Sequence, residues 1–83
     1  MFLHLGGTKI IPAEDIIMIL NLKTAQQSKI YGELIELMRV EGMLEKEIEG
    51  EYKSLAITKE KAYLSPISSL TLKNRLRSWD SDL

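Results

Sequence analysis

The chain has 83 residues, of which 45% are hydrophobic, and its formal net charge is -1. A chain this short has too little apolar surface for two cores, so we expect one domain spanning residues 1–83. A domain of this size buries only roughly 60% of its unfolded surface, and contacts with further subunits are an expected source of stability. The absence of cysteine excludes a disulfide framework and a thiolate zinc site, and with a single histidine we expect no metal and no cofactor.

The amino-terminal residues MFLHLGGTKII contain neither a basic leader nor a long apolar run. The chain also has no stretch near the ~20 apolar residues that a membrane-spanning helix needs. We therefore expect a cytoplasmic protein with no membrane partner.

The first quarter of the chain is typical of β structure. An alternating run at residues 2–5 and a β-branched run at Thr8–Ile11 flank Gly6 and Gly7, which predicts a hairpin. Asp15–Leu22 is a continuous apolar run of strand length, and we interpret it as a central strand buried on both faces. A helix is the alternative for this run, because a short apolar run does not define its own period.

A helix is expected from about Ala25 to Glu41. Thr24 and Gln27 have the spacing of a capping box at its start, and Gly42 is placed to end it in the left-handed conformation. The apolar stripe of this helix consists of Ile30, Leu34, Leu37 and Met38, which follow one another at helical spacing.

The second half of the chain predicts three further strands and a second helix. The strands are Leu44–Ile48, Ser54–Thr58 and Ala62–Ser65, the last of which is ended by Pro66. Ser68 or Ser69 is placed to cap the second helix, whose narrow apolar stripe is formed by Leu72, Leu76 and Trp79. The order βββ-α-βββ-α predicts an α+β fold with a small, mostly antiparallel sheet and two helices.

The second helix also carries positive charge, because the segment from Lys61 to Trp79 contains cations and no acid. Lys73 and Arg77 are one helical turn apart on one face, and Arg75 is displaced from them by roughly 160–200°. From the residues alone, a solvated helix end that gains from the helix dipole explains the cations as well as the two alternatives together, which are a contact with a neighbouring subunit and a grip on phosphate. One monomer would hold DNA only in the non-specific range of ~10⁻⁴–10⁻⁶ M, whereas an oligomer repeats the cations and multiplies their effect.

A row of acids precedes this segment. Glu45, Glu47 and Glu49 would share one face of an extended strand. Solvation of the row is the favoured interpretation, followed by a charge match with another subunit; a calcium site is the least favoured because no oxygen-rich loop accompanies the row.

Catalytic patterns are weak. The single histidine, His4, lies in an alternating run and is expected to be a strand residue with a local hydrogen bond. Ser68 and Ser69 fit a helix cap better than a nucleophile, because no base and orienting acid accompany them. We therefore expect that the protein is not an enzyme.

Two segments, HLGGTKIIPAEDIIMIL and YLSPISSLTLKNRL, closely resemble the RemA/RemB extracellular-matrix regulators of bacteria, the RemB branch in particular. The resemblance runs from about Phe2 to Arg77. It implies a cytoplasmic, non-enzymatic, DNA-binding transcription regulator that activates biofilm-matrix operons. It also implies a homo-oligomeric ring, since the RemA branch assembles into rings that present a LytTR-like DNA-contacting surface.

The resemblance fails at the positions where the RemA branch carries arginines. This chain has Asp15 before the third strand, and Glu51 and Tyr52 after Gly50 in a later turn. DNA contact must then be made by the remaining cations, which are Lys53, Lys73, Arg75 and Arg77. The alternative is a protein-interaction subunit that joins a ring with a RemA-like partner and does not touch DNA.

Overall fold

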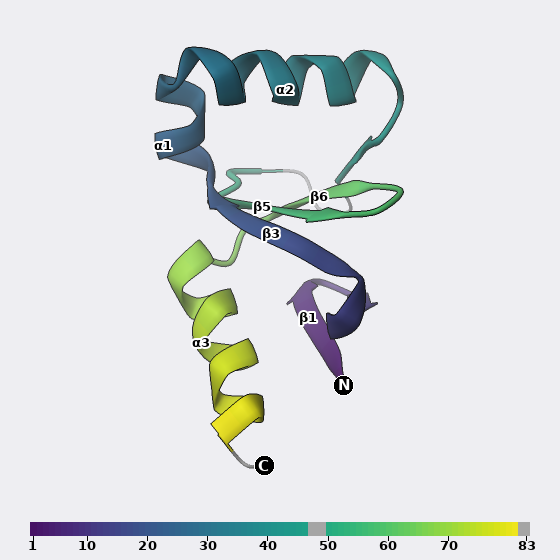
Figure 1. Cartoon of the computed structure of the whole chain (residues 1–83), viewed down its shortest axis with the longest axis vertical. Coiled ribbons are helices and arrows are strands. Elements are labelled where there is room, and N and C mark those ends of the chain that lie inside the picture. The colour runs from purple at the N-terminus through teal and green to yellow at the C-terminus, as the bar shows by residue number, and fades with distance from the viewer. Residues whose placement is uncertain (47–49, 82–83) are drawn as a thin grey trace.

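The protein has an α+β fold in which the predicted order of elements is largely confirmed (Figure 1). The computed structural model describes residues 1–46 and 50–81, with the side chains of the last helix described through Arg77. The strands are β1 (Phe2–Gly6), β2 (Lys9–Pro12), β3 (Ile16–Asn21), β4 (Leu44–Glu45), β5 (Ser54–Thr58) and β6 (Ala62–Ser65). The helices are a 3-10 turn, η1 (Ala13–Asp15), and α1 (Leu22–Gln27), α2 (Lys29–Val40) and α3 (Ser69–Ser81).

The described strands form two sheets where the sequence predicted one. β1 and β2 pair as an antiparallel hairpin, and the other strands form a four-stranded sheet in the order β3-β5-β6-β4. The pairs β3/β5 and β5/β6 are antiparallel, and β4 runs parallel to β6. The prediction that β3 is a central strand buried on both faces is wrong: β3 is an edge strand, and the Ile17 side chain is 61% exposed.

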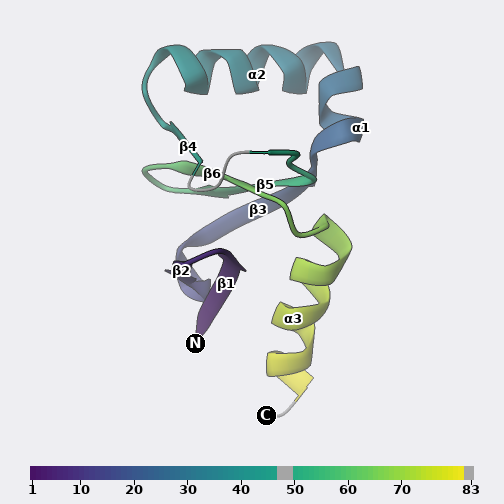
Figure 2. The ribbon, with the colours of Figure 1, turned by 180° about the vertical axis from the view of Figure 1, so that it is seen from behind.

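Three layers result from this arrangement. α1 and α2 cover one face of the four-stranded sheet, and the hairpin and α3 cover the other face (Figures 1 and 2). The core between the sheet, the hairpin and α3 is built around buried Leu3, Leu5, Ile11, Ile19, Ala56 and Leu72. The core between the sheet and α1 and α2 is built around buried Leu22, Met38, Leu55 and Ala62. Side chains alternate along β5, so that Leu55 faces α2 and Ala56 faces α3.

The hairpin turn depends on Gly6 for two reasons. The φ angle of Gly6 is 108°, a conformation that residues with a side chain rarely adopt. A Cβ atom at Gly6 would also lie 3.1 Å from Pro66 Cγ, closer than ordinary packing allows. The hairpin therefore packs directly against the chain that leads into α3. A second contact supports this junction, since the buried hydroxyl of Ser65 donates to the Leu5 carbonyl at 2.6 Å.

The helix predicted from Ala25 to Glu41 is two helices that begin three residues earlier. Asn21 is the N-cap of α1, and its Oδ1 accepts from the Thr24 N–H at 3.1 Å, so the predicted capping box at Thr24 is wrong. Ser28 is in an extended conformation between the helices, and its Oγ accepts from the Tyr31 N–H at 3.3 Å. The predicted C-terminal signal is confirmed, because Gly42 has a φ of 74° and the Met43 N–H donates to the Met38 carbonyl.

The sequence predictions for the second half of the chain concern the strand bounds, the cap of α3 and its apolar stripe. The predicted bounds of β5 and β6 agree with the structure. β4 was predicted over 44–48; the structure shows it over Leu44–Glu45, and residues 47 and 48 lie outside the described residues. Ser68 caps α3 as predicted, because its Oγ accepts from the Thr71 N–H at 3.1 Å. Leu72 and Leu76 face the core, and the Trp79 side chain lies outside the described residues. None of the described helices is both long and apolar enough to cross a membrane.

Candidate nucleic-acid interface

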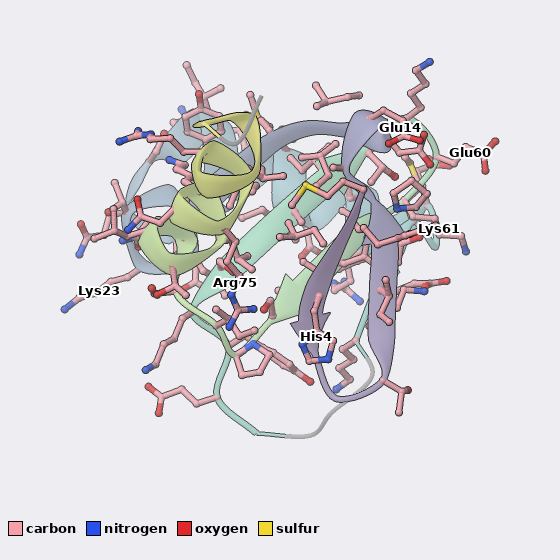
Figure 3. All side chains as sticks on the ribbon, turned by 90° about the horizontal axis from the view of Figure 1, so that it is seen from below. His4, Glu14, Lys23, Glu60, Lys61 and Arg75 are labelled. Atoms are coloured by element: carbon pink, nitrogen blue, oxygen red, sulfur yellow. The ribbon has the colours of Figure 1, made fainter. Side chains whose placement is uncertain are left out.

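The cations predicted on α3 lie on two sides of the helix. Lys73 and Arg77 are exposed and stand one turn apart. Arg75 Nη1 donates to the His4 carbonyl at 3.2 Å, so this guanidinium faces the hairpin (Figure 3). Arg75 thereby ties α3 to β1, although a guanidinium has five N–H donors and this single bond leaves donors for a phosphate. Lys73 and Arg77 project away from the hairpin, because they are turned by roughly 160–200° from Arg75.

Lys53 lies at the point where three segments of the chain meet. Its N–H donates to the Ser65 carbonyl at 2.8 Å, and its carbonyl accepts from the Leu22 N–H at 3.0 Å. The neighbouring hydroxyl of Ser54 donates to the Ile67 carbonyl at 2.6 Å. The start of α1, the residues before β5 and the connection into α3 are therefore held together, and the side chain of Lys53 at this junction is exposed.

Lys23 is a fourth exposed cation of this region, and the sequence analysis missed it. It follows Leu22 in the first turn of α1, and the Leu22 N–H donates to the Lys53 carbonyl, so the two lysines are on neighbouring segments. α1 covers the face of the sheet opposite α3, and Lys23 points away from the hairpin in the view of Figure 3. In the sequence, Lys23 falls between the expected strand and the expected helix, and Asn21 as an N-cap is the signal that would have placed it in the helix. We call Lys23, Lys53, Lys73 and Arg77 the basic surface.

The basic surface is not neutralised by the described part of its own chain. Each of its four side chains is exposed, and none forms a salt bridge with another described residue. Glu14 and Glu60 lie at the opposite end of the molecule from Lys23 (Figure 3). Lys61 lies at the same end as Glu14 and Glu60 (Figure 3), and exposed Glu51 is two residues from Lys53, so acids and bases are mixed over the surface. A local attraction for anions at cations without an acidic partner is nevertheless compatible with a net charge of -1.

The acidic substitutions that the resemblance pointed to lie at two distant places. Asp15 is exposed in η1, beside the end of β5 at which Ile16 pairs with Thr58. Exposed Glu51 and half-buried Tyr52 precede the other end of β5. The five residues of β5 separate the two places by roughly 17 Å, so one copy of the chain does not present them as a single surface.

Glu45, the first residue of the predicted acidic row, is held by cations of its own chain. Its carboxylate lies 2.8 Å from Lys61 Nζ and 3.7 Å from Lys9 Nζ, and Lys9 also lies 4.5 Å from the ring centre of Tyr63. The Glu45 side chain is also 40% exposed, so its charge is compensated by cations of its own chain together with solvent, and a contact with another subunit stays a prediction. Glu47 and Glu49 lie outside the described residues. Glu45, Lys9 and Tyr63 line an open groove of about 470 Å³ between the hairpin, β4 and β6.

The cluster of Glu45, Lys61 and Lys9 makes a testable contribution to stability. The hydrogen bond from Lys61, with its charge and that of Lys9, holds the pKa of Glu45 below the ordinary carboxyl value. A lowered pKa in the folded state means that the stabilisation is present above the ordinary carboxyl pKa and is lost as the pH falls through the lowered value. We expect Glu45→Gln to lower the melting temperature slightly at neutral pH. We also expect the melting temperature of this variant to decrease less than that of the original protein when the pH is lowered. Glu33→Gln, an exposed control on α2, should leave the melting temperature and its pH dependence unchanged. If the original protein and both variants give the same melting temperature at every pH, the ion pairs of Glu45 do not stabilise the fold.

The two residue types considered for catalysis have structural partners. His4 Nε2 donates to the Gly7 carbonyl at 2.8 Å, which confirms the predicted local hydrogen bond within the hairpin. Ser68 is engaged as the cap of α3, and its hydroxyl also bonds to Thr71 Oγ1 at 2.8 Å. His4 and Ser68 thus each stabilise a turn of the fold.

Two comparisons with known proteins, one with family models and one with individual proteins, agree with each other. Residues 2–76 match the family model described as RemA-like, extracellular matrix regulatory protein A-like. The chain is 33% identical over 75 residues to Extracellular matrix regulatory protein B of Bacillus subtilis (strain 168), and the match covers 90% of this chain and 89% of that protein.

Proposed function

Because the chain belongs to the RemA-like family of extracellular matrix regulators, we propose that it is a transcription regulator that binds double-stranded DNA and controls biofilm and extracellular-matrix genes. It acts in the cytoplasm without a cofactor, and it is not an enzyme. It contacts the DNA backbone and responds to DNA shape rather than reading base edges, because few of its cations are placed for bidentate contact with a base.

The basic surface carries this proposal. Its four cations are exposed and free of salt bridges to described residues, and they lie on α1, just before β5 and on α3, segments that hydrogen bonds join at one end of the sheet. Arg75 adds a fifth contact from the hairpin side of α3. Charges held at fixed positions on a rigid scaffold can follow a phosphate backbone, whereas flexible charges lose entropy on binding.

DNA binding by this surface requires assembly of several copies. The cations of one chain neutralise few phosphates, and repetition in a closed ring raises the effective concentration of each contact. The ring and a LytTR-like fold are expected from the resemblance to the RemA branch, whereas the DNA contact passes to the basic surface, because Asp15, Glu51 and Tyr52 stand where that branch carries arginines. The small size of the core supports the same proposal, because subunit burial adds the apolar contacts that one copy lacks.

Salt dependence tests the proposal. Fluorescence anisotropy of a labelled duplex should show an affinity that falls steeply with salt, with a slope of log K against log salt of about −3.6 for each contacting copy if all four cations neutralise a phosphate. Light scattering of the same samples fixes the mass of the bound species. Absence of binding at low salt by an intact oligomer would contradict DNA binding.

The second candidate function is a protein-interaction subunit of a ring that acts with a RemA-like partner without contacting DNA. Its specific support is the exposed acid at Asp15 and Glu51, the positions where the RemA branch carries arginine. This candidate predicts that the assembly binds a RemA-like protein and that the basic surface contacts acids of that protein. Salt-sensitive binding to a RemA-like protein by an assembly that does not bind duplex DNA at low salt would favour it.

A further inference from the structure

The outer face of α2 carries an apolar stripe that the fold of one chain leaves uncovered. The stripe consists of Ile30, Leu34, Leu37 and Val40, whose exposed fractions lie between 36% and 77%. Only Met38 of this helix is buried, with Ile35 partly buried beside it. α2 therefore uses one side of a wide apolar surface against its own sheet, and the other side faces outward at the edge of the molecule (Figure 1).

The spacing of the stripe is that of a helix-packing seam. Ile30, Leu34 and Leu37 follow at intervals of four and three residues, as in the seam of paired helices, and Val40 extends the row. From Ile30 to Val40 the stripe is about 15 Å long. Isolated apolar residues on a surface need no explanation, but four in a continuous row on one helix indicate a contact.

The end charges of α2 indicate what covers the stripe. Lys29 is the first residue of the helix and Glu41 is its C-cap, so each charge has the unfavourable sign for the dipole of its own helix. The first turn contains no acid, and Arg39 in the last turn is bound to Glu36. In an antiparallel pair of α2 helices, Lys29 of one copy lies beside Glu41 and the carboxyl end of the other copy, and both charges become favourable.

We propose that the α2 stripe is a two-fold contact in which α2 of a second copy of this chain packs antiparallel on it. The inference rests on the proposed assembly, and the contact joins copies of two rings, because neighbours within one closed ring meet through unlike surfaces. A helix pair of this length buries less than the ~1,200 Å² of a standard interface, so the contact depends on concentration over the micromolar range and acts together with other subunit contacts. The seam is isologous, which means that the same residues serve on both sides.

The first experiment measures mass by light scattering across the micromolar range. Leu37→Glu places a charge in the centre of the seam and should reduce the mass of the assembly to half or less. Ile10→Glu is the matched control, because Ile10 on the hairpin is 55% exposed and Leu37 is 56% exposed. The control should keep the mass of the original chain, and both variants should keep its far-ultraviolet circular dichroism spectrum. An unchanged mass for Leu37→Glu, or an equal loss in both variants, overturns the proposal.

A charge exchange tests the antiparallel direction. Lys29→Glu and Glu41→Lys each improve the match to the dipole of their own helix, yet each should weaken association because like charges then meet across the seam. The double variant should recover most of the mass, since opposite charges face each other again; a double variant weaker than both single variants overturns the antiparallel contact. The DNA titration separates the two proposals: a mass loss in Leu37→Glu with no DNA binding by the original chain leaves this contact standing and refutes the proposed function.

Discussion

Replacing Lys73 and Arg77 together with alanine is expected to weaken binding to duplex DNA by at least roughly 50-fold at about 0.1 M salt. Each neutralised phosphate contributes roughly 0.9 to the slope of log K against log salt, which is nearly tenfold in affinity between about 1 M and 0.1 M salt. The double variant loses two phosphate contacts for each bound copy, and the two factors of affinity loss multiply. Neither side chain packs in the core, so the melting temperature should change little. Fluorescence anisotropy over a salt series measures both the affinity and the slope.

The charge-matched control for this experiment is Lys59→Glu. Lys59 is exposed in the turn between β5 and β6, away from α3, and its replacement by glutamate changes the net charge by the same amount as the double variant. If DNA contact is local to the basic surface, the control retains most of the affinity and the slope. Lys23→Ala alone should lower the slope by about 0.9, because it removes one phosphate contact. A double variant that binds DNA as well as Lys59→Glu would show that α3 does not face the nucleic acid.

The sequence predicts the fold well where an element ends at a glycine or a proline, because these residues restrict or extend the local backbone conformations. Gly6 marks the hairpin turn, Pro66 ends β6 and Gly42 ends α2, and each acts through local backbone sterics. These signals do not depend on the rest of the chain. The bounds of β5 and β6 and the cap at Ser68 follow from such signals, and the structure agrees with all three.

The errors arise where apolar residues continue across a boundary. The run Asp15–Leu22 reads as one buried strand, but Leu22 is the first residue of α1 and β3 lies at the edge of the sheet. Apolarity alone gave no period over so short a run, and the polar residue inside it, Asn21, was the N-cap. The exposure of Ile17 could not be read locally either, because strand order is set by long-range pairing.

The candidate site shows the same division between local and long-range information. The sequence identifies Lys53, Lys73, Arg75 and Arg77 as cations, but it does not show that Arg75 bonds to His4, 71 residues earlier. Nor does it show that Lys23 and Lys53 are brought together by a hydrogen bond between α1 and the start of β5. Composition gives the charges that a surface can use, and only the fold shows which of them share a surface.

Leu72 is the residue on which the position of the basic surface depends most. Its side chain is fully buried on the inner face of α3, within the core formed by Leu3, Leu5, Ile11, Ile19 and Ala56. Leu72→Ala removes apolar contacts and leaves a cavity, and we expect it to lower the free energy of unfolding by about 2–5 kcal/mol. Since small domains have only about 5–15 kcal/mol in total, this is a large share of the stability, measurable as a lower midpoint of urea unfolding.

Leu70→Ala is the matched control on the same helix, because the Leu70 side chain is 67% exposed. It should change the free energy of unfolding by no more than about 0.5 kcal/mol. The comparison also links stability to function, since Leu72 holds α3, and with it Lys73 and Arg77, against the sheet and the hairpin. At urea concentrations below its unfolding midpoint, the Leu72→Ala variant is still folded and still has Lys73 and Arg77. It should nevertheless bind DNA more weakly, because the distance of these two cations from Lys53 is less firmly fixed. Equal stability losses for the two leucine variants would contradict the docking of α3 described above.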